Sequence, residues 1–419
     1  MTKRPEPRDR APRATQPMLS VEEAQKKVLS AFQRLETEPA AILEATGRVL
    51  ADDIRADVDI PPHANSSMDG YAVQAADTAT ASQESPASLH IIGDLPAGHV
   101  PEQEVEAGTA IRIMTGAPIP PGADAVVKVG DTEMEDGFVH IFTPVEPGNY
   151  VRPAGEDVRR GALVLRRGTR IRAQEIGMLA ALGDTQVPVT RKPRVAILAT
   201  GDELVPIAES LPPGKIRNTN SYSNAAQVIK HGGEPILLGI APDTVAELTA
   251  KIRAGLKQDV DLFLTSGGVS VGDFDLVKDV LAAEGEMDFW RVRMKPGKPL
   301  AFGHIHGVPI LGLPGNPVSV MVSFEMFARP ALLKMQGAAD WERSTVDATL
   351  MDEIPHKDER RHFVRVRLEW EEGEYHAYLT GAQGSGILSS MVKANALAII
   401  PEDWNSAPSG ARVRVIILD

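Results

Sequence analysis

The stretch Arg194–Leu204, RVAILATGDEL, decides the fold of this 419-residue chain. Its first part, Arg194–Thr200, is a continuous apolar run, which predicts a strand buried on both faces of a sheet. Predicted strands and helices alternate after it: strands at 235–240, 261–265 and 309–313, and helices at 223–231, 245–257, 274–283 and 318–335. This alternation is typical of a doubly wound, mostly parallel sheet, in which ligands bind outside the carboxyl ends of the strands.

Three loops that follow these strand ends carry unusual polar residues: ATGDEL at 199–204, TSGGVSVGDFD at 265–275, and GLPGNPVS at 312–319. The glycines of the second loop allow the backbone to approach an anion, and its N–H groups and the following helix N-terminus supply positive potential. The hydroxyls of Thr265, Ser266 and Ser270 add donors. We therefore expect a phosphate-binding loop; the alternative is a tight strand-to-helix connection that needs glycine for geometry alone.

Acidic residues are predicted at the same sheet edge. Carboxylates beside a polyphosphate require a cation between them, and Mg²⁺ prefers oxygen ligands. The candidates are Glu203, Asp243, Asp273 and Asp275. The alternative is helix capping or a first-turn position, which applies to Asp202, Asp273 and Asp275 and also to Asp243.

Two further segments carry candidate functional residues. The turn MKPGKP at 294–299 holds two lysines in a rigid cluster suited to an oxyanion, although a solvated surface turn has the same composition. The loop NSSMDGYA at 65–72 is polar, and Asp69–Gly70 could form its tip. The ten histidines show no HExxH pattern, so no zinc site is predicted, and the absence of cysteine excludes disulfides and thiolate ligands.

The rest of the chain predicts several domains. The basic, proline-rich residues 1–17 suggest a flexible tail without the apolar core of a secretion signal. A helix should begin at Ser20, which fits a capping box with Glu23, and a second short helix is predicted at about 40–53. We expect residues 18–60 and 151–190 to form a helical linking domain, with the helix-compatible 163–182 packed beside the N-terminal helices. The other expected units are a β-rich domain at 61–150, inserted into the linking domain, the α/β domain at 191–336, and a small β-barrel at 337–419.

Charge and hydropathy limit the class of partner. A net charge of −13 argues against general nucleic-acid binding. No apolar run approaches the roughly 20 residues that a membrane-spanning helix needs. A cytoplasmic protein without nucleic-acid or membrane partners is therefore expected.

Taken together, these segments resemble the molybdopterin molybdenumtransferase family, the MoeA and gephyrin E-domain group. The resemblance runs over the chain after residue 18 and rests on motifs in family order: NSSMDGYA (65–72), MTGAPIP (114–120), ATGDEL (199–204), TSGGVSVGDFD (265–275), KPGKP (295–299), GLPGNPVS (312–319) and GSG (384–386). Each motif is weak alone, but their shared order is specific. One departure is Ser67, where alanine is common in the family.

The resemblance implies four domains per protomer and an elongated homodimer with the active site at the protomer interface. It implies that molybdate is inserted into adenylylated molybdopterin, with Mg²⁺ present, to give molybdenum cofactor and AMP. Glu203, Asp243 and Asp275 would hold Mg²⁺ at the pyrophosphate linkage, with Asp69 and Thr115 contributed by the partner. The loop with Thr265, Ser266, Gly267, Gly268, Ser270 and Gly272 would hold the phosphate and nucleotide. The pocket for molybdate would comprise Lys295, Lys298, Pro314, Pro317, Ser319, Arg365 and Ser385.

Three alternatives stay open on the sequence. The chain could adenylylate molybdopterin with ATP, for which the α/β domain alone would suffice. It could be a non-catalytic dimeric scaffold, although a scaffold need not keep the acidic residues and lysines. It could also be an impaired paralogue for tungstate, because lysine and arginine treat the two oxyanions alike. Transient contact with a molybdopterin adenylyltransferase or a molybdoenzyme is also expected.

Overall fold

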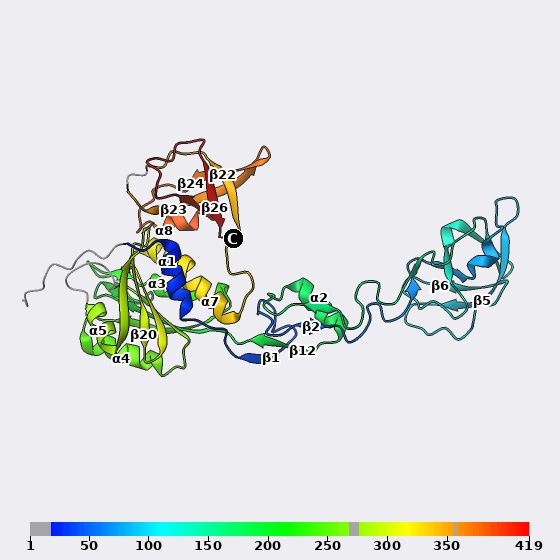
Figure 1. The fold of residues 1–419 in the computed structure, drawn as a ribbon, viewed down its shortest axis with the longest axis horizontal. Helices are drawn as coiled ribbons and strands as arrows, with labels where there is room; N and C mark the ends of the chain where they lie inside the picture. Colours follow the sequence, from blue (N-terminus) through cyan, green and yellow to red (C-terminus); the bar gives the residue numbers. More distant parts are fainter. Residues whose placement is uncertain (1–17, 268–275, 356–357, 419) are drawn as a thin grey trace, which may run out of the picture.

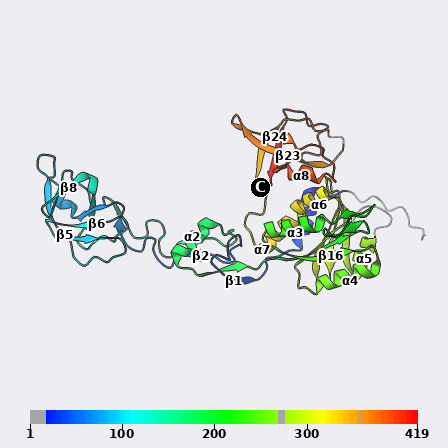
Figure 2. The same ribbon diagram turned by 180° about the vertical axis from the view of Figure 1, so that it is seen from behind.

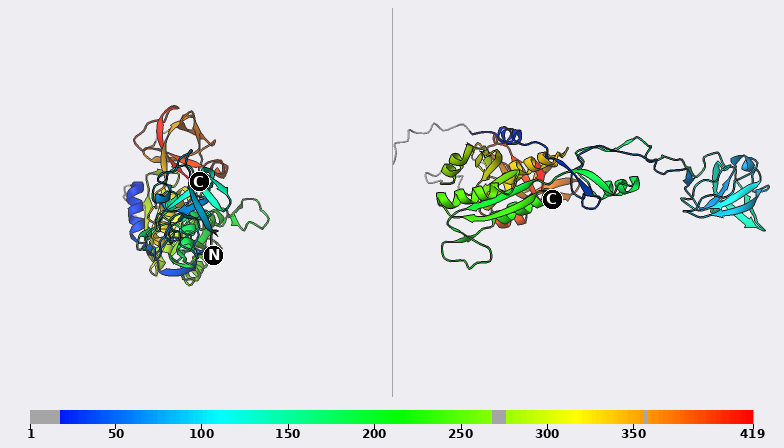
Figure 3. Two further views of the ribbon diagram at one scale, coloured as in Figure 1. Left: turned by 90° about the vertical axis from the view of Figure 1, so that its right-hand side faces the viewer. Right: turned by 90° about the horizontal axis from the view of Figure 1, so that it is seen from below.

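The computed structural model describes residues 18–267, 276–355 and 358–418 of an elongated molecule. Figure 1 shows the α/β unit and the C-terminal unit at one end, a small unit containing α2 (Ala173–Leu182) in the middle, and the β-rich unit at the far end. Figure 2 shows the same arrangement from behind, and the two turned views of Figure 3 agree with it. Residues of the β-rich unit thus lie far from the α/β unit of their own chain.

The α/β unit is built on a six-stranded sheet in the order β16–β13–β17–β21–β20–β18. Neighbouring strands are parallel from β16 to β21, while β20 and β18 add antiparallel pairings. The strand bounds are β13 (Arg194–Thr200), β16 (Glu234–Ala241), β17 (Leu262–Ser266), β18 (Gly285–Arg291), β20 (Pro299–Ile305) and β21 (Val308–Leu313). The predicted doubly wound, mostly parallel sheet is confirmed, with an antiparallel edge that the sequence pattern did not show.

Helices cover both faces of this sheet, and the side chains on both faces of β13 are apolar and buried. Val195 and Ile197 belong to one core, and Ala196 and Leu198 belong to the other. The first core is covered by α3 (Asn220–Lys230) and by a continuous helical run from α6 (Pro317–Ser323) through a π-helical turn (Phe324–Ala328) to α7 (Arg329–Gln336). The second core is covered by α4 (Val245–Leu256) and α5 (Leu276–Glu284).

Helix α1 (Val21–Ser30) begins with the predicted capping box: the Glu23 N–H donates to Ser20 Oγ at 3.1 Å, and the Ser20 N–H donates to Glu23 Oε2 at 2.7 Å. Its buried side chains, however, pack into the first core of the α/β unit and not beside residues 163–182. The predicted packing was therefore wrong for α1, whereas the 40–50 segment does share a core with Ile171 and Leu179. The physical reason is the anchor before the helix, where the Leu19 N–H donates to the Arg291 carbonyl of β18 at 2.9 Å.

The middle unit contains less helix than predicted. The expected helix at about 40–53 is absent: β1 (Thr37–Ala41) pairs with β12 (Gln186–Thr190), and a turn follows it. The local apolar spacing suggested a helix, but cross-strand pairing with β12 prevails and Gly47, at φ 78°, ends the turn. Within 163–182 only α2 is helical, since β11 (Leu163–Leu165) pairs with β2 (Ile54–Arg55). This unit has its own core around Leu50, Leu179 and Val189.

The other two units are β structures. The β-rich unit holds a sheet in the order β7–β4–β6–β5–β9–β8, with bounds β4 (Gly70–Val73), β5 (Ala87–Leu95), β6 (Thr109–Ile113), β7 (Ala125–Lys128), β8 (Thr132–Glu135) and β9 (Phe138–Ile141). The C-terminal unit is the predicted small barrel, because β23 pairs with both β24 and β25 and so closes the ring. Its strands are β22 (Thr345–Leu350), β23 (Arg361–Glu371), β24 (Glu374–Leu379), β25 (Ala396–Ile400) and β26 (Arg412–Ile417).

Short elements complete the fold: β3 (Asn65–Ser66), β10 (Val151–Arg152), β14 (Leu204–Val205), β15 (Ile216–Arg217), β19 (Met294–Lys295), α8 (Leu388–Val392) and two 3-10 turns at Ala75–Thr78 and Val129–Asp131. Among the described helices, none is long and apolar enough to cross a membrane.

Candidate functional site

The carboxyl ends of β13, β17 and β21 bring three glycine-containing loops together. The Gly267 N–H donates to the Leu313 carbonyl at 3.2 Å. A Cβ at Gly267 would lie 2.7 Å from the Thr200 carbonyl oxygen, and a Cβ at Gly315 would lie 3.7 Å from the Gly267 Cα. Because Gly267 also has φ 93°, only glycine fits this junction without strain. The prediction that these loops meet at one edge is confirmed for the described residues, which include the second loop as far as Gly267.

Two hydroxyls stand at the end of β17, before the predicted phosphate loop. Thr265 and Ser266 are buried, and neither hydroxyl has a hydrogen-bond partner in the described part of the chain. A buried hydroxyl without a partner is costly, so Thr265 and Ser266 remain predicted ligand donors. The predicted loop residues Gly268, Ser270 and Gly272 lie outside the described residues, as do Asp273 and Asp275.

Asp202 and Asp243 tie the loop after β13 to the loop after β16. The Asp243 N–H donates to Asp202 Oδ1 at 3.0 Å, and the Asp202 N–H donates to Asp243 Oδ2 at 3.3 Å. The N-cap of α4 is Thr244, whose Oγ1 accepts from the Glu247 N–H at 3.4 Å. Asp243 is therefore not the helix cap, and Asp202 precedes a strand and not a helix.

Glu203 projects over the same loop. A Cβ at Gly201 would lie 2.4 Å from Glu203 Oε2, so glycine there makes room for the carboxylate. Both Glu203 and Asp243 are exposed to solvent. Among residues 18–267, 276–355 and 358–418, no group of three acidic or histidine side chains is arranged to hold a metal. The described part of the predicted metal set is thus a pair of carboxylates on adjacent loops.

The loop before α6 is held by α3 and by the barrel. Asn220, the first residue of α3, donates from Nδ2 to the Gly315 carbonyl at 2.8 Å. Asn316 donates from Nδ2 to Ser385 Oγ at 3.0 Å, and the Val318 N–H donates to the Ser385 carbonyl at 3.0 Å. The predicted residues Pro314, Pro317, Ser319 and Ser385 therefore belong to one junction. Asn220 is not among the predicted site residues; its place just before the helix predicted at 223–231 is a usable signal.

Arg365 supports this junction from inside the barrel. Its side chain is 1% exposed, and its guanidinium donates to Ser390 Oγ at 3.0 Å and to the Gly384 carbonyl at 3.1 Å. Burial lowers the pKa of Arg365 to about 10, so the group remains charged at neutral pH. The guanidinium therefore positions the 384–386 loop, while the predicted contact with an oxyanion stays a prediction.

The KPGKP turn lies between α6 and the barrel. β19 pairs with β23, and a Cβ at Gly297, at φ 100°, would lie 2.6 Å from Ser323 Oγ of α6. Lys295 Nζ lies 3.6 Å from Asp358 Oδ2, where Arg360 lowers the pKa of the Asp358 carboxyl. Lys298 is half-buried. The turn is thus packed against its neighbours and is not a free surface loop.

Asp69 and Thr115 form a pair in the β-rich unit. Asp69 Oδ1 accepts from the Thr115 N–H and from Thr115 Oγ1, both at 2.7 Å. These two hydrogen bonds lower the pKa of Asp69. Within one chain the β-rich unit, which carries this pair, lies at the far end of the molecule from the α/β unit, with the middle unit between them (Figures 1 and 2).

Family models cover most of the chain. Residues 19–183 match the MoeA N-terminal region (domain I and II), residues 196–334 match a probable molybdopterin binding domain, and residues 347–418 match the MoeA C-terminal region (domain IV). The fold and the loops at its sheet edge thus define a multidomain protein built around a molybdopterin-binding type of α/β unit.

Relatives are similar over nearly the full length. The chain is 38% identical to the molybdopterin molybdenumtransferase of Nostoc, over 96% of this chain and 94% of that protein. It is 36% identical to the enzyme of the same name from Bacillus subtilis, over the same shares. The crystal structure of the molybdopterin biosynthesis moeA protein from Pyrococcus horikoshii superposes with a TM-score of 0.84 at 36% identity, over 96% of this chain and 100% of that chain. The chain belongs to the molybdopterin molybdenumtransferase family, a family of transferases.

Proposed function

We propose that this protein inserts molybdate into adenylylated molybdopterin and releases AMP, giving molybdenum cofactor. The observation that supports this most is the junction of three loops at one sheet edge, with Glu203 and Asp243 on one side and the buried hydroxyls of Thr265 and Ser266 on the other. Membership of the family, in which the N-terminal and C-terminal regions also match, favours insertion over simple adenylylation or a scaffold role.

The sheet edge suits a phosphorylated ligand. Backbone N–H groups and hydroxyls at the carboxyl ends of parallel strands bind phosphate oxygens. The lysines of the KPGKP turn and the hydroxyls of Ser319 and Ser385 would bind molybdate, a tetrahedral dianion. Arg365 would keep Ser385 in place through its hydrogen bond to the Gly384 carbonyl.

The exposed carboxylates fit Mg²⁺, which prefers oxygen ligands and keeps several waters. Glu203 and Asp243 would hold the ion, together with Asp275, which lies outside the described residues. When bound, Mg²⁺ neutralises charge on the departing phosphate. Asp202 keeps the two metal-binding loops adjacent through its bond with the Asp243 N–H.

The separation of Asp69 and Thr115 from the α/β unit supports a site shared between two protomers. The chain would act as a homodimer in which the β-rich unit of one protomer reaches the loops of its partner. We further propose a cytoplasmic location and transient contact with the enzyme that supplies adenylylated molybdopterin or the enzyme that receives the cofactor.

The test is AMP release from adenylylated molybdopterin by the purified protein with Mg²⁺, with and without molybdate. We expect molybdate-dependent AMP release that is lost in Asp275→Ala. ATP consumption with molybdopterin and no AMP release from the adenylylated substrate would assign adenylyltransferase activity. Replacing molybdate by tungstate in the same assay shows which oxyanion the pocket accepts.

A further inference from the structure

The residue at the start of α6 does not cap its own helix. Asn316 occupies the N-cap position, where an asparagine side chain usually accepts a hydrogen bond from the second or third N–H of the helix. Here the Asn316 side chain makes no such bond. The Val318 N–H, one of these orphan donors, is satisfied by the Ser385 carbonyl of the barrel at 3.0 Å. The side chain of Asn316 is therefore released from the capping role that its position predicts.

The amide of Asn316 bonds to a hydroxyl instead. Its Nδ2 donates to Ser385 Oγ at 3.0 Å, across the junction between the α/β unit and the barrel. The backbone and the side chain of Ser385 thus both meet the first residues of α6, one through Val318 and the other through Asn316. A residue type suited to capping is used here to contact a side chain of another unit.

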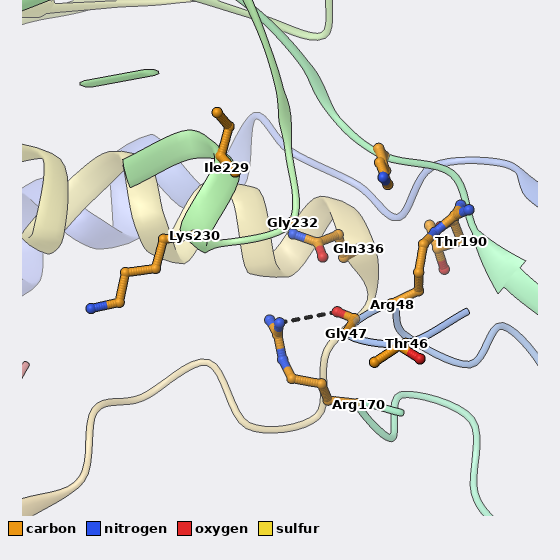
Figure 4. A pocket seen from close by; sticks show the side chains of 10 residues that line it. Thr46, Gly47, Arg48, Arg170, Thr190, Ile229, Lys230, Gly232 and Gln336 are labelled. Carbon is orange, nitrogen blue, oxygen red and sulfur yellow. Dashed lines mark hydrogen bonds between the residues drawn. The ribbon is translucent and has the colours of Figure 1, made fainter. Parts of the chain in front are cut away.

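Gln336 shows what a purely structural amide does in the same unit. It lines a cavity between the middle unit and the α/β unit, where it lies beside Gly232 (Figure 4). Its Nε2 donates to the carbonyls of His231 at 2.7 Å and Leu332 at 3.0 Å, so it holds the backbone in place. Asn316 differs because its partner is a hydroxyl, whose proton can still be donated to something else.

The contact sets the direction of the Ser385 proton. A serine hydroxyl has one proton to donate and two lone pairs that accept. Ser385 Oγ accepts from Asn316, and within residues 18–267, 276–355 and 358–418 no group accepts its proton. Because the Asn316 N–H points at the oxygen, the O–H bond must point away from Asn316. A hydroxyl that accepts one hydrogen bond is also a stronger donor for the next. Ser385 is only half-buried, so a ligand can reach it.

The loop that carries Ser385 is held by other contacts. Arg365 donates from NH2 to the Gly384 carbonyl at 3.1 Å, and the Arg365 N–H donates to Gln383 Oε1 at 2.9 Å. The Val318 N–H holds the Ser385 carbonyl. None of these bonds involves the side chain of Asn316. Removing that side chain should therefore change the direction of the hydroxyl and leave the loop in place.

We propose that Asn316 is a positioning residue for the oxyanion, because it directs the Ser385 hydroxyl proton toward a tetrahedral dianion bound in the pocket. This proposal rests on the proposed function, in which Ser385 binds molybdate. Asn316 does not touch the ion and acts through Ser385. The hydrogen bond from Ser385 is made as soon as the ion binds, so loss of Asn316 should raise the KM for molybdate and leave kcat nearly unchanged.

A double-mutant cycle on the full-length protein tests this relationship. The KM for molybdate is measured from AMP release with Mg²⁺ in Asn316→Ala, Ser385→Ala and the double variant. We expect Ser385→Ala to raise the KM about tenfold and Asn316→Ala about fourfold, while the double variant matches Ser385→Ala. Asn405→Ala, which changes an exposed asparagine of the barrel, is the matched control and should keep the KM of the unmodified protein.

Asn316→Asp tests the direction of the hydrogen bond. It keeps the shape of the side chain and replaces the donor by an acceptor, so the Ser385 proton should turn toward the new carboxylate. The KM for molybdate should rise further than in Asn316→Ala. Repulsion between the carboxylate and the ion persists in the Ser385→Ala background, whereas the part of the loss caused by the hydroxyl should disappear there.

The outcomes separate this proposal from the proposed function. A loss in Asn316→Ala that is equally large with and without the Ser385 hydroxyl overturns the positioning role, because Asn316 would then act on the loop. No loss in Asn316→Ala, while Ser385→Ala loses affinity, also overturns it and leaves the oxyanion pocket standing. An unchanged KM in Ser385→Ala removes Ser385 from the pocket and overturns both.

Two further measurements keep the test decisive. Circular dichroism checks that each variant folds, and Asn316→Ser, which is too short to reach Ser385 but suits an N-cap, replaces Asn316→Ala if that variant does not fold. If the unmodified protein releases no AMP, molybdate is titrated into the same variants by calorimetry. The same pattern of affinities then supports the positioning role, and any other pattern overturns it.

Discussion

Asp202 and Asp243 each accept a hydrogen bond from the backbone N–H of the other, at 3.0 Å to Asp202 Oδ1 and 3.3 Å to Asp243 Oδ2. This reciprocal pair joins two loops at the carboxyl edge of the sheet and leaves Glu203 exposed beside them. From this pair we predict that Asp202 positions the two loops and that Glu203 contacts the ligand.

Replacing Asp202 tests this division of roles. Asp202→Ala removes the acceptor for the Asp243 N–H and should lower kcat/KM for AMP release about tenfold, while Asp202→Asn keeps an oxygen acceptor and should stay near the unmodified value. Glu203→Gln should lose at least a hundredfold because it removes a proposed metal ligand. Equal losses in Asp202→Asn and Asp202→Ala would show that the charge of Asp202 matters, and with it that Asp202 takes part in metal binding.

The proposed shared site predicts complementation between two inactive chains. Asp69→Asn and Glu203→Gln should each be nearly inactive alone. If Asp69 acts on the loops of the partner, a mixed dimer contains one site with both residues intact. Equal mixing with free exchange should then recover about one quarter of the unmodified activity. Mass photometry of tagged chains confirms that the dimers exchange. If activity still does not recover, Asp69 and Glu203 either act in the same site of one chain or do not share a site.

The hydrogen bonds from Thr115 lower the pKa of Asp69, so the carboxylate stays ionised well into the acid range. Any stability that this pair provides is present above the unfolded pKa and is lost as the pH falls through the lower folded pKa. Thr115→Val removes the hydroxyl donor and keeps the backbone donor. The pKa of Asp69, followed by NMR of its carboxyl carbon, should rise in this variant and stay unchanged in Thr115→Ser. If the pKa of Asp69 in Thr115→Val equals that in the unmodified protein, the Thr115 backbone N–H alone lowers it.

Gly267 should tolerate no side chain. Alanine there combines φ 93° with a Cβ 2.7 Å from the Thr200 carbonyl oxygen. We expect Gly267→Ala to cost about 1–3 kcal/mol in the free energy of unfolding and to weaken substrate binding, since strain displaces the loop. Gly177→Ala is the control: its Cβ meets nothing within 4 Å in α2, so it should stabilise the protein by about 0.5–1 kcal/mol. Urea denaturation measures both variants, and a Gly267→Ala as stable as Gly177→Ala would contradict the prediction.

His231 should make stability depend on pH. It stacks on Phe324, and burial lowers its pKa to about 4. The unfolded chain therefore binds a proton near pH 6.5 that the folded chain binds only near pH 4. Above about pH 7, His231 should add no pH dependence to the free energy of unfolding. Between pH 6.5 and 4, its protonation in the unfolded chain should lower that free energy by about 3 kcal/mol. His231→Gln should lose that part of the pH dependence in urea titrations at fixed pH steps. An unchanged slope would mean that His231 is protonated in the folded protein.

Helices and strands with strong local signals could be predicted from the sequence. The capping box at Ser20 and Glu23 fixed the start of α1, and the apolar run of β13 identified a strand buried on both faces. The segment 40–53 could not be predicted correctly, because its apolar spacing suits a helix while its partner β12 lies far away in sequence. Cross-strand pairing of this kind is a long-range interaction that local propensity does not encode.

The sequence by itself determined the α/β unit, the glycine-rich edge and the kinds of residue predicted to bind a phosphorylated ligand, because periodicity, glycine and carboxylate positions act locally. Only the tertiary structure decided that α1 joins the α/β core, that Arg365 is buried behind the 384–386 loop, and that Asn316 donates to the Ser385 hydroxyl. These relationships depend on which surfaces bury each other and which polar groups find a partner, and both are settled by contacts between residues far apart in the chain.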